Sequence, residues 1–203
     1  MTVEVWTARL DEPPGAAADD LSPEDRRRAG AYLRPEVARA WIASRSALRR
    51  VLAFYIDQPP AEIGLETGAN GKPRVMGDAE LEFNLSHSGE LALIAVSRSR
   101  PVGVDVERIA PGRDLLELAE RALDRAVVEE IRETVPAERP AVFYDAWVRH
   151  EARLKCLGSG LTGAPPAGAV AIAGLDVPSG YAAAVAVAGT EVGKVRHRVL
   201  RRD

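Results

Sequence analysis

Apolar residues alternate with polar or small residues over several stretches of the chain, which is the pattern of strands packed on one face. The first stretch, VEVWTARL, covers residues 3–10, and residues 81–98 read as a strand, a short loop and a second strand. VGVDVERI at 102–109 has the same alternation. Two apolar segments near the end, 170–177 and 181–189, complete the set. We therefore expect strands in both halves of the chain.

A longer period predicts helices between these strands, because apolar residues three or four positions apart share one helix face. The longest such run covers residues 36–56, and another covers about 140–158. A shorter helix is expected after Ser22, a capping residue that is followed by a proline in the favoured first position. Further helices are predicted over about 114–123 and 124–133. The basic C-terminal run KVRHRVLRRD is expected to be a frayed, solvated tail.

The two long helices are similar to each other. Residues 40–52 and 146–158 align without gaps, and the matched pairs are Trp41 and Trp147, Arg45 and Glu151, and Arg49 and Lys155. We therefore predict an α+β fold with a pseudo-twofold pair of lobes, each a small antiparallel sheet packed with a long helix. The N-terminal lobe is expected over residues 1–101 and the C-terminal lobe over 102–203. The active site would lie in the cleft between them.

Composition narrows the class of protein. The 203 residues are 46% hydrophobic and 28% charged, with a formal net charge of -3, which gives no indication of nucleic-acid or membrane binding. A single cysteine, Cys156, excludes a disulfide framework and fits a reducing compartment. No apolar run approaches the roughly 18 residues of a membrane span, and the N-terminus has no signal-peptide pattern. We expect a cytoplasmic protein.

The strand at 102–109 carries two acids on one face. Asp105 and Glu107 lie opposite three alternating valines. A solvated strand face is the ordinary explanation for such acids. However, Asp and Glu are poor strand formers, and a pair of carboxylates is a good start for a hard cation such as Mg²⁺. The residues alone leave both interpretations open.

Two other segments carry candidate chemistry. Glu151 and Lys155 are one helical turn apart, which suits either an exposed ion pair or an acid and a cation of an active site. In NLSHSG at 84–89, Ser86 and His87 are typical of a polar turn, and a protonated histidine there would also suit phosphate. No G-x-S-x-G elbow is present, which argues against a serine hydrolase.

Taken together, FNLSHSG, VGVDVERI and, about forty residues later, WVRHEARLKCLGSGL resemble the ordered motifs of the 4′-phosphopantetheinyl transferases. The resemblance extends to GKP at 71–73 and to the long helix with Arg45. The length near 200 residues and the paired lobes resemble the single-chain, surfactin-synthetase-activating branch of this family. The resemblance implies a monomeric transferase. It would move the 4′-phosphopantetheine arm of coenzyme A (CoA) to a serine of an acyl or peptidyl carrier protein and release adenosine 3′,5′-bisphosphate. The branch suggests polyketide or nonribosomal peptide biosynthesis, although fatty-acid and lysine-pathway carriers remain open.

The resemblance also implies residue roles in the C-terminal lobe. Asp105, Glu107 and Glu151 match the three carboxylates that hold Mg²⁺. Glu151 is in addition the candidate base for the incoming serine, acting directly or through a metal-bound water. Lys155 matches the lysine that faces the α-phosphate of CoA and offsets charge on the leaving group. The carrier would dock on the region after the metal strand, residues 110–123 and the helix that follows.

The N-terminal lobe would contact the nucleotide of CoA. Ser86 and His87 match the turn near the 3′-phosphate, and Lys72 matches a lysine over the adenine and ribose phosphate. Arg45 is a plausible ligand of the 3′-phosphate because guanidinium binds phosphate bidentately. For Arg45 and Lys72, solvated surface positions are an equally good interpretation.

One residue departs from the family pattern. His150 stands where the family has lysine before the glutamate, and an imidazole with an ordinary pKa of about 6.5 is mostly neutral at pH 7. This leaves an alternative: a catalytically impaired member that binds CoA or a carrier without turnover. A metal-dependent phosphohydrolase that uses the same carboxylates is a further alternative.

Overall fold

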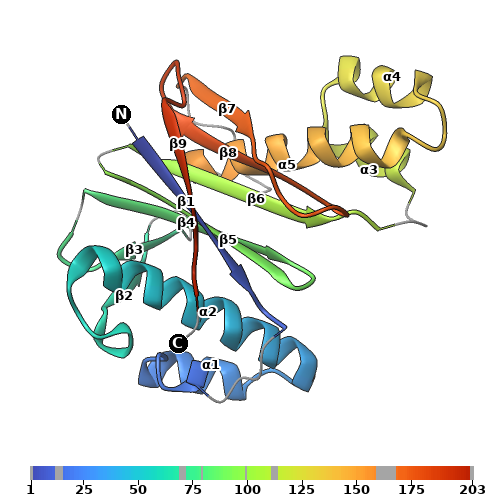
Figure 1. Ribbon diagram of the computed structural model, residues 1–203. Coiled ribbons are helices and arrows are strands. Elements are labelled where there is room, and N and C mark those ends of the chain that lie inside the picture. Colours follow the sequence, from blue (N-terminus) through green and yellow to red (C-terminus); the bar gives the residue numbers. More distant parts are fainter. Residues whose placement is uncertain are drawn as a thin grey trace.

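In the computed structural model, two sheets pack face to face between two long helices (Figure 1). The structure describes residues 2–11, 16–68, 72–78, 80–98, 100–110, 114–158 and 168–201. The first sheet has the strand order β4-β5-β1-β9, and the second has the order β6-β8-β7. The predicted α+β fold with two lobes is therefore confirmed.

The first sheet belongs mainly to the N-terminal half. Its strands are β1 (Thr2–Arg9), β4 (Leu81–Ser88), β5 (Leu91–Arg98) and β9 (Lys194–Val199). The long helix α2 (Pro35–Ile56) covers its outer face, with Leu48 and Leu52 fully buried against Phe83 and Ile94. The short helix α1 (Pro23–Gly30) lies beside α2, and a small hairpin of β2 (Leu65–Thr67) and β3 (Pro73–Val75) completes the lobe. Ser22 caps α1, as the sequence predicts, by accepting a hydrogen bond from the backbone N–H of Asp25.

The second sheet belongs to the C-terminal half. Its antiparallel strands are β6 (Val102–Arg108), β7 (Val170–Gly174) and β8 (Tyr181–Ala188). Helix α5 (Arg139–Leu157) covers its outer face. Helices α3 (Leu115–Ala122) and α4 (Arg125–Glu133) pack against the N-terminal part of α5.

Valines and other small apolar residues fill the space between the two sheets. The buried residues of this layer are Val3, Val5, Leu91, Leu93, Ala95, Val102, Val104, Val106, Ala183, Val185 and Val187. Alternation in the sequence explains this layer, because every second residue of each strand points into it. The valines of β6 lie in this core, and the side chains of Asp105 and Glu107 consequently face α5.

Strand β6 packs very closely on helix α5, and this packing determines how near the two acids lie to the helix. A Cβ built on Gly103 would lie 2.1 Å from the carbonyl oxygen of Ala152 and 2.3 Å from the backbone nitrogen of Cys156. Only glycine permits the strand and the helix backbone to touch in this way. The close packing at Gly103 therefore allows Asp105, two residues further along β6, to contact Lys155 of α5.

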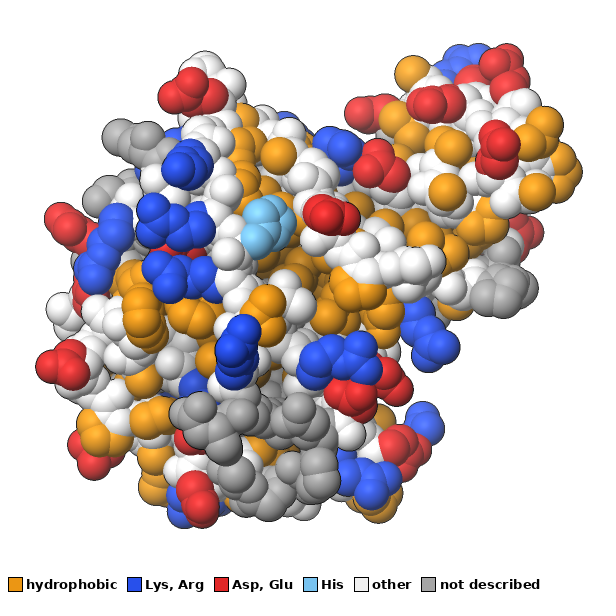
Figure 2. Space-filling view, viewed as in Figure 1, with side chains coloured by type: hydrophobic (Ala, Val, Ile, Leu, Met, Phe, Trp, Pro, Cys, Tyr) orange, Lys and Arg blue, Asp and Glu red, His pale blue; other side chains and the backbone are white. Residues whose placement is uncertain are grey.

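The predicted frayed tail is wrong. Residues Lys194–Val199 form β9, which pairs in parallel with β1, so the last described strand of the chain joins the sheet of the N-terminal half. Glu4 on β1 receives hydrogen bonds from Arg196 at 3.2 Å and from Arg198 at 3.0 Å. The run reads as a charged tail because its partner strand lies at the other end of the chain. Both acidic and basic side chains lie on the face of the molecule that Figure 2 shows.

Candidate active site

A cavity of about 470 Å³ opens between the two lobes. Strand β4 supplies residues of its wall from the first lobe, and β6 and α5 supply the rest from the second. The lining residues are Leu85, Ser86, His87, Asp105, Glu107, Trp147, Glu151 and Lys155. The structure thus brings together most of the candidate site residues, which lie on three separate segments of the chain.

Asp105 lies at the bottom of this cavity and is only 2% exposed. Ser86 donates a hydrogen bond of 2.8 Å to its Oδ1 atom. The ammonium of Lys155 donates to the same oxygen at 2.5 Å and to Ser86 Oγ at 3.0 Å. A buried carboxylate needs such partners, because an isolated charge in the interior is very costly. Lys155 therefore lies beside the acids and pairs with one of them.

Glu107 lies one pleat repeat further along β6. Ser88 on β4 donates a hydrogen bond of 2.7 Å to its Oε2 atom. Each of these two serines of β4 therefore donates a hydrogen bond to one carboxylate of β6. This pairing shows that Asp105 and Glu107 are held at the lobe junction.

Glu151 faces the acids of β6 from helix α5. Burial raises its pKa, and the charges of Asp105 and Glu107 raise it further, although the nearby ammonium of Lys155 acts in the opposite direction. Two buried oxygens in this group, Asp105 Oδ2 and Glu151 Oε1, have no hydrogen-bond partner. Buried polar atoms are rarely left in this state without a functional reason.

The donor atoms fit a hard divalent cation. Carboxylate oxygens are the ligands that Mg²⁺ prefers, and it usually needs only one or two of them together with phosphate oxygens and waters. Within the described ranges, however, no three His, Cys, Asp or Glu side chains are already arranged as a metal-binding group. In this arrangement the ammonium of Lys155, rather than a third carboxylate, contacts Asp105.

His87 and Trp147 form part of the cavity wall. Partial desolvation and then the positive charge of Lys155 lower the pKa of His87, so the imidazole is neutral at pH 7. Trp147 stacks on Phe143 with ring centroids 5.6 Å apart and packs against the cluster under α3 and α4. Its ring therefore anchors α5 and also contributes to the wall.

Lys72 lies at the lobe junction. Its Nζ atom donates to Glu82 at 3.1 Å and to the backbone carbonyl of Val102 at 3.0 Å. Its neighbour Gly71, part of the GKP motif, lies outside the described residues, as do residues 111–113 of the region expected to meet the carrier. In this structure Lys72 thus links the hairpin, β4 and the start of β6.

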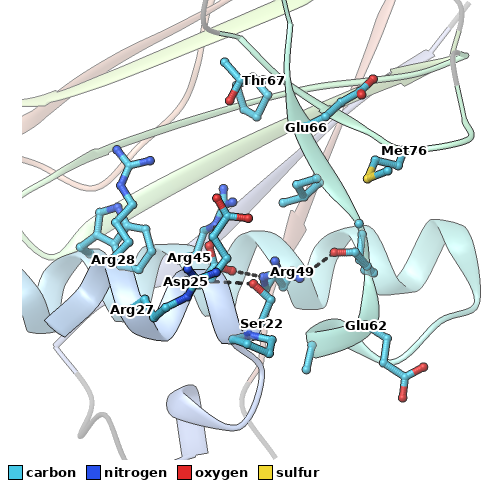
Figure 3. Close-up of a pocket in the computed structure, with 18 residues that line it drawn as sticks. Ser22, Asp25, Arg27, Arg28, Arg45, Arg49, Glu62, Glu66, Thr67 and Met76 are labelled. Atoms are coloured by element: carbon cyan, nitrogen blue, oxygen red, sulfur yellow. Dashed lines mark hydrogen bonds and ion pairs between the residues drawn. The ribbon is translucent and has the colours of Figure 1, made fainter. Parts of the chain in front are cut away.

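Arg45 lines a different cavity, of about 660 Å³, in the N-terminal lobe (Figure 3). It donates at 2.9 Å to Asp25 of α1, and Arg49, which is 2% exposed, holds the other oxygen of the same carboxylate. Burial alone would raise the pKa of Asp25, but Arg45 and Arg49 outweigh it and hold that pKa below its usual value. Arg28 also lines this cavity and, like Arg45, lies near the ring of Trp41. The helix positions matched to Glu151 and Lys155 are thus used here to join α1 to α2.

His150 faces neither of these cavities. It lines a groove of about 890 Å³ between α4, α5 and β7, together with Asp124 and Arg153. Desolvation lowers its pKa, with Asp124 acting against this and Arg153 adding to it. The departure from the family motif therefore falls in a separate groove from the acids.

Sequence reasoning missed Ser88 and Asn84 as members of the lobe junction. Asn84 accepts a hydrogen bond of 2.9 Å from the backbone N–H of Val104, and Ser88 accepts one of 3.0 Å from Arg108. The signal was the alternation of polar residues along β4, at positions 82, 84, 86 and 88. The sequence predicts a polar turn in part of this segment, whereas in the structure strand β4 continues up to Ser88.

Two family models match the chain. Residues 101–188 match the 4′-phosphopantetheinyl transferase superfamily, and residues 5–99 match the N-terminal part of a 4′-phosphopantetheinyl transferase. Together these matches contain every element that lines the cavity between the lobes.

Several named proteins are similar to the chain over most of its length. It is 34% identical to the 4′-phosphopantetheinyl transferase HetI of Nostoc sp., over 78% of this chain and 70% of that protein. It is 26% identical to a 4′-phosphopantetheinyl transferase of Bacillus subtilis, over 79% of this chain and 72% of that protein. Identity to the human L-aminoadipate-semialdehyde dehydrogenase-phosphopantetheinyl transferase is 28%, over 71% of this chain and half of the human protein.

Proposed function

The chain belongs to the 4′-phosphopantetheinyl transferase superfamily, and from this premise we propose that it transfers the 4′-phosphopantetheine arm of CoA to a serine of a carrier protein. The observation that carries the proposal is the cavity between the lobes. There, three carboxylates and a lysine from distant segments line one space, and two buried carboxylate oxygens have no partner. With a divalent cation held by its carboxylates, such a site suits a substrate that is rich in phosphate.

The chemistry requires a proton acceptor and a stabilised leaving group. The serine hydroxyl of the carrier attacks the β-phosphorus of CoA, and the bond from that phosphorus to the bridging oxygen breaks. The proton of the serine passes to Glu151, whose carboxylate lines the cavity from α5. The departing adenosine 3′,5′-bisphosphate keeps the bridging oxygen. Lys155 would turn toward this oxygen and offset its developing charge.

Asp105, Glu107 and Glu151 would hold Mg²⁺. The ion, when bound, would neutralise the pyrophosphate and polarise it toward attack. Lys155 pairs with Asp105 in the structure, and its long flexible side chain would turn toward the α-phosphate once the acids hold a cation. The carboxylates would then contact the ion, and Lys155 would contact the substrate.

The nucleotide of CoA would lie across the N-terminal lobe. Ser86 and His87, which line the cavity, would contact the 3′-phosphate, and a phosphate near His87 would raise its pKa and let it donate. Arg45 and Lys72 now pair with Asp25 and Glu82. They would contribute to CoA binding by turning from these partners toward phosphate.

The carrier would dock on α3 and the residues around it. Basic and acidic side chains alternate there, with Arg121 bound to Glu117 and Arg132 to Glu120. We propose that the protein acts as a monomer of the surfactin-synthetase-activating branch, in the cytoplasm. No helix in the described part of the chain is long and apolar enough to cross a bilayer.

The test is a transfer assay with the full chain, CoA, Mg²⁺ and several purified carrier proteins, followed by intact mass spectrometry. The expected result is a gain of one phosphopantetheine on at least one carrier, which disappears with a chelator and with Asp105→Ala. Tight CoA binding with no transfer to any carrier would favour the impaired, binding-only alternative. Release of phosphate from CoA without a carrier would favour a phosphohydrolase.

A further inference from the structure

The edges of the two sheets meet beside the active-site cavity without pairing as strands. Strand β4 is the edge of the first sheet, and β6 is the edge of the second. Polar side chains of β4 receive alternate backbone N–H groups of β6 instead: Asn84 receives that of Val104, Ser86 that of Val106 and Ser88 that of Arg108. These side chains replace a main-chain ladder and satisfy an edge that would otherwise be exposed.

Ser88 makes two hydrogen bonds at this junction, and they use different atoms of its hydroxyl. The oxygen accepts from the N–H of Arg108 at 3.0 Å, and the hydrogen is donated to Oε2 of Glu107 at 2.7 Å. A serine hydroxyl has one donor and two acceptor sites, so both bonds can form at once. The backbone contact orients the hydroxyl, and the hydroxyl in turn fixes one oxygen of the carboxylate.

We propose that Ser88 is a positioning residue that holds Glu107 in the geometry needed for the divalent ion, a role that rests on the proposed function. Glutamate has several rotatable bonds, and holding it in one rotamer costs conformational entropy. Because Ser88 already restricts the Glu107 side chain in the folded protein, ion binding does not have to supply that conformational entropy. Hydrogen-bond partners of metal ligands typically change ion affinity by about 10- to 100-fold when they are removed.

Asn84 offers a matched control on the same strand. It makes the same kind of contact with a β6 amide, but that contact goes to Val104 and involves no carboxylate. Its removal should therefore loosen the junction without releasing Glu107. A comparison of the two variants separates a structural role at the junction from control of the carboxylate.

The experiment measures Mn²⁺ binding by calorimetry, as a readout independent of turnover, for the wild type and for the variants Ser88→Ala, Ser88→Thr and Asn84→Ala. We expect about a 10-fold loss of Mn²⁺ affinity in Ser88→Ala and a value within about 3-fold of wild type in Ser88→Thr, which keeps the hydroxyl. Asn84→Ala should melt at a lower temperature with wild-type ion affinity. The Mg²⁺ concentration for half-maximal transfer should shift in parallel with the Mn²⁺ affinity.

Wild-type ion affinity in folded Ser88→Ala would overturn the inference, and so would an equal loss in Asn84→Ala. If Ser88→Ala does not fold, Ser88→Cys provides the same test, because a thiol has a similar shape but is a weak donor. A wild type that transfers the arm but binds no Mn²⁺ would overturn the inference and leave the transferase activity standing. A wild type that binds Mn²⁺ and transfers to no carrier would count against the proposed function, while a weakened Ser88→Ala would still support the positioning role.

Discussion

The ammonium nitrogen of Lys155 lies 2.5 Å from Oδ1 of Asp105, although the two residues are 50 positions apart in the chain. One comes from the last turns of α5 and the other from the buried strand β6. The pair is unequal, because the aspartate side chain is 3% exposed and that of the lysine 30%. The buried acid therefore depends on the lysine, whereas the lysine keeps access to the cavity and to anything bound there.

Replacement of Lys155 by methionine should lower the rate of transfer by about 100- to 1,000-fold, because the charge that offsets the leaving phosphate is lost. It should also lower the melting temperature, since Asp105 would be left buried without its cation. Rates are read by mass spectrometry and unfolding by circular dichroism. Lys194→Met, on exposed β9, is the control and should change neither. A Lys155→Met enzyme with wild-type turnover would exclude the lysine from the chemistry.

The close packing of β6 on α5 leads to a second prediction. In Gly103→Ala the new methyl group would overlap the backbone of Ala152 and Cys156, so the helix must move away from the strand. We expect a destabilisation of about 1–3 kcal/mol or more, measured by denaturant unfolding, and a loss of activity as Glu151 and Lys155 move away from Asp105.

Gly30→Ala is the matched control for that substitution. A Cβ built on Gly30 would meet no atom within 4 Å, and Gly30 is the last residue of helix α1. Alanine there should be neutral or slightly stabilising, by up to about 1 kcal/mol. Equal effects of the two alanines would mean that the close approach at Gly103 is unimportant.

Much of this arrangement follows from local patterns. The alternating valines of β6 predict a strand with Asp105 and Glu107 on its other face, and the spacing of Glu151 and Lys155 places both on one helix stripe. The motifs then predict that these segments meet, and the structure brings them to one cavity.

Other features depend on contacts that no local pattern contains. Lys72 and Arg45 have long side chains that reach several partners, so sequence cannot tell whether they meet phosphate or a carboxylate. Strand β9 depends on a partner nearly the whole chain away, and its charged residues therefore resemble a solvated tail. Ser88 was missed because its role depends on the meeting of two sheet edges, which only the tertiary structure determines.

A third prediction concerns the buried ion pairs of the N-terminal lobe. Asp25→Asn would leave Arg49 buried without its anion, at a cost of about 3–5 kcal/mol at neutral pH. Arg45 and Arg49 hold the pKa of Asp25 below its usual value, so the stabilisation is present above the ordinary aspartate pKa and is lost as the pH falls through the lowered one. The difference in unfolding free energy between wild type and variant should therefore shrink in acid. A difference that is independent of pH would contradict the role of the charge.

A fourth prediction addresses the departure from the family motif. His150 lines a groove separate from the acids, so His150→Lys should leave the Mg²⁺ requirement and the affinity for CoA within about 3-fold of wild type. CoA affinity is measured by calorimetry, and the Mg²⁺ requirement by titration of transfer activity. A rise in turnover of 100-fold or more in the lysine variant would instead show that the histidine impairs this chain, as the binding-only alternative requires.

A fifth prediction concerns Glu151, which should be required for activity although its buried carboxylate lowers the stability of the folded state. Its pKa is raised by burial first and by Asp105 and Glu107 next, so the folded state takes up a proton more readily than the unfolded chain. A group of this kind favours the fold while it is protonated, and that contribution is lost as the pH rises through the raised pKa. At pH 8 the wild type therefore retains an unfavourable carboxylate, which Glu151→Gln removes. The variant should melt higher than wild type at pH 8, with the gain diminishing toward pH 4, and should lose transfer activity by about 100- to 10,000-fold.

Mg²⁺ should raise the melting temperature of the wild type and have a smaller effect on the variant. A variant less stable than wild type at pH 8 would mean that the carboxylate is well paired, and a variant that retains activity would remove Glu151 from the role of base.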